Sequence, residues 1–352
     1  MTMKKLYIHI GTHKTGTTSI QNRLNEYKYS LLKNDAFYIS TTGIFKKIPR
    51  LTSYDKNLVL KARNELITHM QKFTEISTFI TSSEHLSGDC YTGYKNSMLM
   101  SQMLFDIVSK LNVKVYIVIY IRRQDRFIES LYGDIIENGH PVPEFKKFIN
   151  FNKEHYNWNL LVKSYEKKFN KKRIIVRSFD DTLKDGGVLK DFCNCINIPI
   201  IPDIKLNSGS PLGSIELQRI CNLNLEKEDS DKFSRIIKHR NTMPGAIKLN
   251  KKYYFDNNDR ELFLKKYQQS NNYIISSYNL PPFPNVTMDK KTSVVDMQDV
   301  FMAMINTITQ TKEYRAKYTS RKTTLLCIKI KKAFHLASYK IQNLRKNMKY
   351  TK

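Results

Sequence analysis

Short apolar runs alternate with longer segments of helical spacing over the first 196 residues. The runs are rich in β-branched and aromatic side chains, which is typical of buried strands. They cover residues 6–10, 36–40, the start of 77–86, 113–121 and 173–180. Between them, apolar residues recur every three or four positions, at 20–32, 57–73, 97–110 and 122–138. Strands that alternate with helices predict an α/β fold with a central, mostly parallel sheet flanked by helices.

The pattern changes after residue 197. Residues 198–202 and 207–211 contain proline, glycine or serine and predict loops. Helical spacing then resumes at 212–224, 229–240 and 259–279. We therefore predict one domain over residues 1–311, with a sheet-forming core at about 4–196 and a helical remainder at 197–311. Residues 312–352 form a separate C-terminal tail of different composition.

The predicted tail is strongly basic. It carries thirteen Lys or Arg residues and one acid, Glu313, and so contributes +12 (13 − 1) to the net charge of +27. Its apolar residues, among them Ile330, Phe334 and Leu344, fall on one stripe of a helix. A basic amphipathic helix is typical of segments that lie on an anionic membrane surface or bind a partner. The alternative, a helix packed back on the domain with solvated lysines, is equally compatible with the sequence.

Composition narrows the classes of function. The chain has 352 residues and 41% hydrophobic content, which is sufficient for a packed core. Its 59 basic against 32 acidic residues indicate anionic partners, such as nucleotide phosphates, an acidic polymer or a membrane surface. The five cysteines are scattered and lack the spacing of a zinc site or a disulfide framework. No apolar run suits a signal peptide or a membrane span, so we expect a cytoplasmic protein.

The sequence GTHKTGTTS follows the first predicted strand and precedes the first predicted helix. Strand, glycine loop and helix form the geometry in which backbone N–H groups and a helix N-terminus face one anion. Gly11 and Gly16 have the spacing of a Walker A loop. However, Thr17 occupies the position of the Walker lysine, and the lysine of this loop is Lys14, before the second glycine.

A loop with lysine before its second glycine, followed by Thr-Thr, resembles the 5′-phosphosulfate-binding loop of sulfotransferases that use 3′-phosphoadenosine 5′-phosphosulfate (PAPS). The segment GTHKTGTTSIQ is especially similar to that of the bacterial carbohydrate sulfotransferases. The resemblance covers residues 4 to about 196 and implies a P-loop-like fold. It also implies that the loop residues bind the 5′-phosphosulfate, namely Thr12, His13, Lys14, Thr15, Gly16, Thr17, Thr18 and Ser19. Lys14 would neutralise charge on the bridging oxygen as it leaves.

A second motif follows the predicted strand at 113–121. Arg122 stands at the strand end and Ser130 lies eight residues later, which resembles the 3′-phosphate-binding motif of the same enzymes. A guanidinium forms planar, charge-assisted bonds to phosphate oxygens, and a serine hydroxyl adds one more. Family members often carry Tyr-Glu-Asp after a later strand, with the tyrosine touching the adenine. Here Phe179 keeps the ring and lacks the hydroxyl. The Arg-Lys-Gly segment of the cytosolic phenol and steroid branch is absent.

Two candidates for a general base follow the strand that begins at residue 77. Glu84 and His85 come just after its carboxyl end, where ligands bind in open parallel sheets. The resemblance implies that a histidine or glutamate at this place accepts the proton of the acceptor. Glu84 is therefore assigned to this role, with His85 as the alternative. A carboxylate that caps the next helix would explain Glu84 about as well.

These features predict a PAPS-dependent sulfotransferase that needs no metal. The resemblance implies that a sulfuryl group is transferred in line to a hydroxyl or amine. The resemblance to bacterial members favours a glycan or glycolipid acceptor, and the positive charge favours an anionic one. We expect no nucleic-acid partner. The basic tail would attach the enzyme peripherally to the inner face of the membrane.

Two other functions stay open at this point. A P-loop kinase of a small molecule or nucleotide needs a lysine at residue 17 and a strand-end aspartate for magnesium, whereas the strand at 113–121 is followed by Arg122 and Arg123. A non-catalytic binder of polyanions or nucleic acid would explain the charge. It would not explain the glycine loop, the spacing of Arg122 and Ser130, or Glu84.

Overall fold

The chain divides into two compact units. The computed structural model describes residues 3–40, 53–151, 156–203, 210–240, 253–284, 299–300 and 303. The first unit comprises Met1–Phe127, Asn152–Leu206 and Glu261–Val286. The second comprises Ile128–Phe151, Asn207–Arg260 and Thr287–Lys352. The predicted tail at 312–352 lies outside the described residues, so the predicted division at residue 311 stays a prediction.

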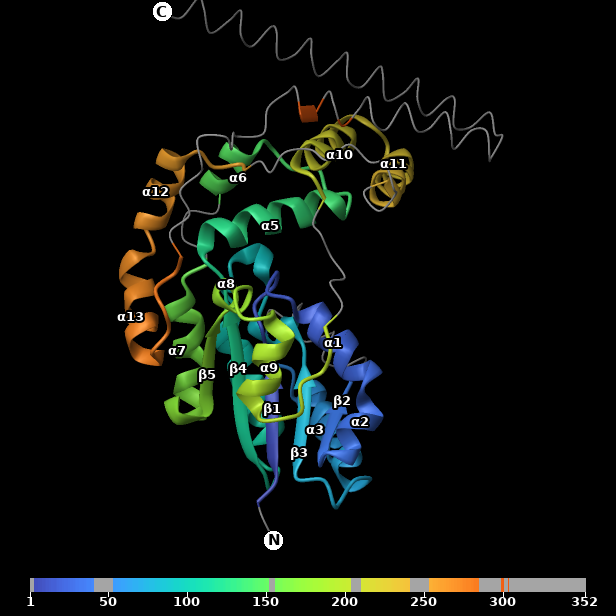
Figure 1. Cartoon of the computed structure of the whole chain (residues 1–352), viewed down its shortest axis with the longest axis vertical. Helices are drawn as coiled ribbons and strands as arrows, with labels where there is room; N and C mark the ends of the chain where they lie inside the picture. The colour runs from blue at the N-terminus through green and yellow to red at the C-terminus, as the bar shows by residue number, and fades with distance from the viewer. Residues whose placement is uncertain are drawn as a thin grey trace, which may run out of the picture. The chain divides into compact units, whose positions relative to one another are not determined.

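The first unit contains a five-stranded sheet in which all paired strands are parallel, in the order β2-β3-β1-β4-β5. Its strands are β1 (Lys5–His9), β2 (Ala36–Ile39), β3 (Thr78–Ser82), β4 (Lys114–Ile121) and β5 (Ile174–Ser178). Each overlaps a run for which the sequence predicts a strand. Helices flank the sheet (Figure 1), so the predicted α/β fold class is confirmed.

The helices of this unit bury both faces of the sheet. They are α1 (Thr17–Glu26), α2 (Lys28–Lys33), α3 (Lys56–Gln71), α4 (Ser97–Val108), α7 (Trp158–Phe169), α8 (Phe179–Thr182), α9 (Val188–Ile196) and α13 (Gln268–Tyr278). Ile20 of α1 and Phe192 of α9 pack with Val118 of β4 in one core cluster. The alternate residues Ile117 and Ile119 are fully buried on the other face, and α7 packs against β4 and β5. This explains why the β4 sequence is apolar almost throughout.

Two predicted helices are each broken in the structure. The helix predicted at 20–32 begins earlier, at Thr17, and is split into α1 and α2 at Tyr27. The helix predicted at 259–279 is split into α12 (Asn257–Lys265) and α13 around Tyr267. At each break the tyrosine ring packs on a neighbour, on the Arg23 guanidinium for Tyr27 and on the Phe263 ring for Tyr267. Apolar spacing alone continues through such a break, so the pattern cannot reveal it.

The second unit is helical and aromatic. It contains α6 (Phe145–Phe151), α10 (Leu212–Asn224) and α11 (Lys227–Arg240), together with most of α5 (Gln124–Glu137) and the start of α12. Rings of Tyr132, Phe145 and Tyr254 pack with centroids 4.7–5.2 Å apart. The Asn222 side chain donates to the backbone oxygens of Ile136 and His140, which fixes α10 to the end of α5. The predicted helix at 212–224 is confirmed.

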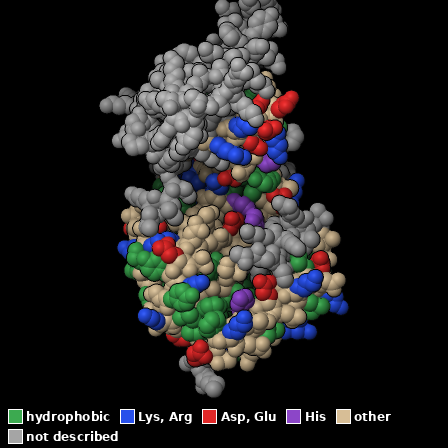
Figure 2. Space-filling view, turned by 90° about the vertical axis from the view of Figure 1, so that its right-hand side faces the viewer, with side chains coloured by type: hydrophobic (Ala, Val, Ile, Leu, Met, Phe, Trp, Pro, Cys, Tyr) green, Lys and Arg blue, Asp and Glu red, His purple; other side chains and the backbone are tan. Residues whose placement is uncertain are grey.

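Charge on the described surface is mixed in sign. On the face shown in Figure 2, Lys and Arg side chains lie at separate positions with Asp and Glu side chains between them. Residues 1–311 carry +15 (27 − 12) of the net charge, and the remaining +12 belongs to the tail. Among the described residues, no helix has the length and apolar composition needed to cross a membrane.

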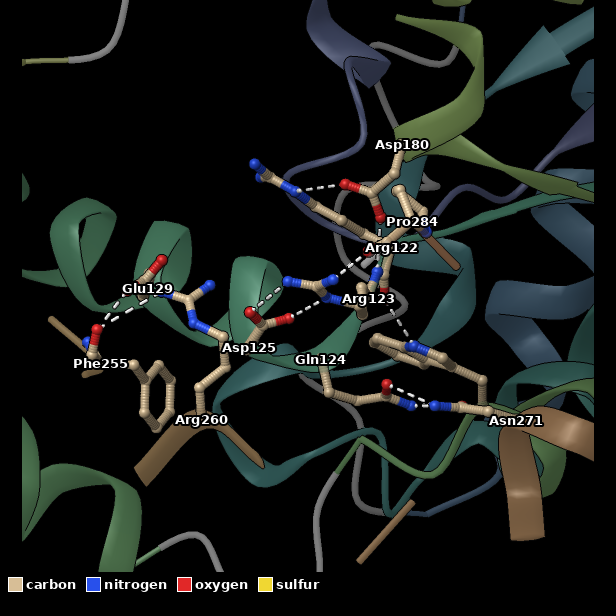
Figure 3. Close-up of polar contacts among 11 residues, drawn as sticks. Arg122, Arg123, Gln124, Asp125, Glu129, Asp180, Phe255, Arg260, Asn271 and Pro284 are labelled. Carbon is tan, nitrogen blue, oxygen red and sulfur yellow. Dashed lines mark hydrogen bonds and ion pairs between the residues drawn. The ribbon is translucent and has the colours of Figure 1, made fainter. Parts of the chain in front are cut away.

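A buried ion pair stabilises the turn between β4 and α5. Nε and one terminal nitrogen of Arg123 donate to the two carboxylate oxygens of Asp125, at 2.6 and 2.8 Å, and both residues are buried. Arg123 also donates to the backbone oxygen of Pro284 (Figure 3). Beside this pair, Gln124 and Asn271 exchange two amide hydrogen bonds. These contacts attach α13 and the segment after it to the end of β4.

Replacing Asp125 by Asn should lower the free energy of unfolding by about 3–5 kcal/mol, because the guanidinium of Arg123 is left buried without its counter-charge. Urea denaturation would measure this loss. The matched control is Glu228→Gln, which breaks the exposed pair of Glu228 with Lys232 and should cost less than about 1 kcal/mol. Similar losses for the two variants would contradict the stabilising role of the buried pair.

Candidate active site

The loop between β1 and α1 needs glycine at two positions. Gly11, Lys14 and Gly16 have φ angles of +51°, +62° and +80°, in the left-handed region that favours glycine. A Cβ atom on Gly11 would lie 2.8 Å from Oγ1 of Thr17, and one on Gly16 would lie 2.7 Å from Cγ1 of Val188. Both glycines are therefore required by space as well as by backbone conformation, and Lys14 adopts its conformation under strain.

Hydrogen bonds join the loop to β4 and also connect residues within the loop. The backbone N–H and the hydroxyl of Thr12 both donate to the carbonyl of Tyr120, at 3.1 and 2.9 Å. The hydroxyl of Thr15 donates to the carbonyl of Thr12 at 2.6 Å. Both threonines are fully buried, so their hydroxyls shape the loop. Their predicted contact with a ligand stays a prediction.

The N-terminus of α1 presents backbone donors. The first bond of this helix runs from the N–H of Ile20 to the carbonyl of Gly16, so the N–H groups of Thr17, Thr18 and Ser19 precede it. No side chain caps this end, and no acidic residue lies in the first turn. The helix dipole and these donors together favour an anion.

The hydroxyl of Thr17 supports a phosphate-like ligand at this place. Thr17 is 4% exposed, and its Oγ1 has no hydrogen-bond partner among the described residues. Leaving a buried hydroxyl unpaired costs about 1–3 kcal/mol, which an anionic oxygen at the helix N-terminus would remove. The residues present therefore fit a 5′-phosphate or phosphosulfate group.

Arg122 lies against the loop. Its guanidinium donates to the carbonyl of Lys14 at 3.2 Å and lies over the ring of Phe179, 5.3 Å from the ring centroid. A Cβ atom on Gly16 would lie 3.4 Å from the same ring. The backbone oxygen of Arg122 accepts a bond from the indole N–H of Trp158 at 2.8 Å. The structure thus brings together the predicted residues Lys14, Gly16, Arg122 and Phe179.

Asp180 orients this arginine, which the sequence did not indicate. One carboxylate oxygen accepts the backbone N–H of Arg123 at 2.7 Å, and the other lies 3.9 Å from Nε of Arg122 (Figure 3). Burial raises the pKa of Asp180, and the two arginines oppose that rise. The available signal was its position: a carboxylate just past the end of β5, beside the strand that ends in two arginines.

Ser130 lies on α5, in the second unit, whereas Arg122 belongs to the first. Their joint action on one phosphate therefore stays a prediction.

Glu84 contacts α1, the helix after the loop, and His85 contacts the loop itself. Nε2 of Gln21 donates to a carboxylate oxygen of Glu84 at 3.0 Å and to the backbone oxygen of Ser82 at 3.1 Å. The ring centroids of His85 and His13 are 5.5 Å apart. The short helix η3 (Glu84–Ser87) begins with Glu84, and its N-cap residue Ser83 makes no side-chain capping bond. Gln21 lies four residues after Thr17 on α1, so the two side chains share one face of this helix. That face carries Thr17 at the candidate anion site and, through Gln21, contacts the candidate base Glu84.

A neutral histidine lies beneath the loop. Nδ1 of His9 is 2.8 Å from the Ser82 hydroxyl, and burial lowers the pKa of His9 to about 3. Its Nε2 has no hydrogen-bond partner among the described residues and would lie 3.3 Å from a Cβ atom on Gly11. The described part of the chain holds no group of three or more His, Cys, Asp or Glu residues that could bind a metal.

The fold and the site define an α/β protein with a glycine loop, a candidate anion-binding site, at the end of its middle strand. No protein-family model matches the chain. An uncharacterized protein of Archaeoglobus fulgidus is 27% identical over 176 residues, which are 48% of this chain and 47% of that protein. The chain thus matches about half the length of this relative.

A solved structure also shows a likeness to the chain. The crystal structure of a sulfotransferase from Alicyclobacillus acidocaldarius aligns with 64% of this chain and 95% of its own, at 16% identity and a TM-score of 0.38.

The buried His9 should make folding sensitive to acid. Its pKa is about 3 in the folded protein against an ordinary 6.5, so between these values the unfolded chain binds a proton that the folded chain does not. The free energy of unfolding should therefore fall as the pH falls through this window, by up to about 1.4 kcal/mol per pH unit from this group. His9→Asn should flatten that slope in urea titrations at several pH values. The exposed control His140→Asn should keep it, and equal slopes in all three proteins would contradict a buried neutral His9.

Proposed function

We propose that this protein is a sulfotransferase that uses PAPS and sulfates a glycan or glycolipid. The observation that supports the proposal is that the glycine loop and Arg122 both lie against one aromatic ring, that of Phe179. Gly16 precedes the uncapped start of α1, and a Cβ atom on it would lie 3.4 Å from the Phe179 ring. The Arg122 guanidinium lies over the same ring. An adenosine that carries phosphates at both its 3′ and 5′ positions has matching groups.

The loop and Arg122 would each bind a different phosphate of this nucleotide. The N–H groups and hydroxyls of Thr17 and Thr18 would hold the 5′-phosphate, and Arg122, oriented by Asp180, would bind the 3′-phosphate. Phe179 would stack on the adenine. When bound, PAPS supplies an activated sulfuryl group. Lys14 would neutralise the negative charge that develops on the 5′-phosphate as that group departs.

Glu84 would accept the proton of the acceptor. Gln21 holds one oxygen of its carboxylate at 3.0 Å, and the other has no hydrogen-bond partner among the described residues. A carboxylate held at one oxygen can accept a proton at the other without moving. His85, against the loop residue His13, is the alternative base.

The acceptor and its location are part of the same proposal. A glycan or glycolipid is supported by the resemblance of residues 11–21 to the bacterial carbohydrate enzymes, and an anionic one by the net charge of +27. The basic tail would hold the protein at an anionic membrane, where each Lys or Arg contributes about 1 kcal/mol.

The nucleotide preference distinguishes this proposal from its rivals. We expect adenosine 3′,5′-bisphosphate to bind without magnesium and more tightly than ATP, because Arg122 and the loop match its two phosphates. Calorimetry would measure both affinities. Arg122→Ala should weaken the bisphosphate by about 1.5–3 kcal/mol.

The matched control is Arg173→Ala, which removes an arginine near the opposite end of β5 and should leave this affinity unchanged. Magnesium-dependent ATP binding with no preference for the bisphosphate would favour a P-loop kinase. Salt-dependent DNA binding without nucleotide binding would favour a polyanion binder.

Removing the base should slow turnover and leave nucleotide binding intact. A general base contributes roughly 10²–10⁴-fold to the rate, so Glu84→Gln should lose about this factor while its affinity for the bisphosphate stays close to that of the wild type. The assay is transfer from labelled PAPS to an acceptor found by screening glycans extracted from the source organism. If His85→Asn shows the large loss and Glu84→Gln stays active, His85 is the base.

A further inference from the structure

Tyr94 contacts the anion-binding loop from outside it. Its hydroxyl accepts the backbone N–H of His13 at 3.0 Å and lies 3.2 Å from Nδ1 of the same residue. Ser87 lies close enough to this hydroxyl to influence its pKa. Tyr94 is only 4% exposed. One buried hydroxyl therefore binds the loop at His13 and lies near η3, the short helix that begins with Glu84.

The ring of Tyr94 is held in an aromatic cluster of Tyr94, Phe127, Tyr156 and Trp158. The centroids of the other three rings lie 6.2, 6.4 and 5.8 Å from that of Tyr94. Trp158 in turn donates to the backbone oxygen of Arg122. The same packed group of rings thus contacts the loop through Tyr94 and the arginine through Trp158.

The Tyr94 hydroxyl is suited to a permanent hydrogen-bonded contact with the loop. Burial raises the pKa of Tyr94 well above its ordinary value, so the phenol stays protonated and can accept one bond while donating another. Tyr94 has a φ angle of +64°, and its backbone N–H and carbonyl bond to Asp89 and Ser97. A non-glycine residue keeps such a strained conformation only where the surrounding contacts enforce it.

We infer that Tyr94 is a positioning residue, whose hydroxyl holds the His13 peptide and so sets the conformation of the anion-binding loop beside Glu84. The N–H of His13 is satisfied by the protein itself, so it does not need a ligand oxygen. The loop is thereby preorganised before the nucleotide arrives, which reduces the cost of binding. The part of this inference that concerns nucleotide affinity rests on the proposed function; the part that concerns the loop does not.

Tyr94→Phe tests the inference, because it keeps the ring in the cluster and removes only the hydroxyl. The matched control is Tyr156→Phe, which removes a buried hydroxyl from the same cluster that donates to the backbone oxygen of Cys90 instead. Hydrogen exchange of the peptide covering the loop would be measured in the full-length, ligand-free proteins. Calorimetry with adenosine 3′,5′-bisphosphate would follow, and thermal melting would establish that both variants are folded.

We expect faster exchange of the loop amides and a roughly 2- to 12-fold weaker affinity for the bisphosphate in Tyr94→Phe, and neither change in Tyr156→Phe. Loop exchange equal to that of the wild type in Tyr94→Phe would overturn the inference. So would equal acceleration of loop exchange in both variants, since it would indicate a general effect on the cluster. If loop exchange accelerates only in Tyr94→Phe but the wild type does not bind the bisphosphate, the role of Tyr94 stands and the proposed function fails.

Discussion

The position of β1 between β3 and β4 is the constraint on which the site depends. Its backbone is bonded on both sides, and these bonds continue past the strand end: the N–H of Ser83 reaches His9, and that of Thr12 reaches Tyr120. The loop that follows β1 therefore begins between the carboxyl ends of β3 and β4. A middle strand brings the loop, Glu84 and Arg122 to one edge, because parallel strands all end on the same side.

Buried polar groups then determine how these residues are oriented. Asp180 fixes the backbone of Arg123 and the side chain of Arg122, and Gln21 fixes Glu84. Each of these partners comes from a different element of the fold, so the site is assembled from several elements rather than carried by one. In contrast, Oγ1 of Thr17 remains without a described protein partner. The contacts of Asp180 and Gln21 therefore hold the candidate site in place.

Several elements show which structural features the amino-acid pattern predicts and which it does not. The apolar runs predicted all five strands of the described sheet, because burial on a sheet imposes a strong local pattern of β-branched residues. The helices broken at Tyr27 and Tyr267 were predicted as continuous, because their apolar spacing does not change where the backbone bends. The glycine loop was found from spacing alone, since φ angles above zero and close packing restrict Gly11 and Gly16 whatever the rest of the chain does.

The class of fold, the glycine loop after β1 and the candidate base residues could all be predicted from the amino-acid sequence, because each depends on a local pattern of burial, turn geometry or charge. Which side chains come into contact is visible only in the folded structure. The contacts of Gln21 with Glu84, of Tyr94 with His13 and of Asp180 with Arg122 each join segments more than 40 residues apart. Such contacts follow from strand order and helix packing, which no local pattern encodes, and they decide how the candidate site is held in place.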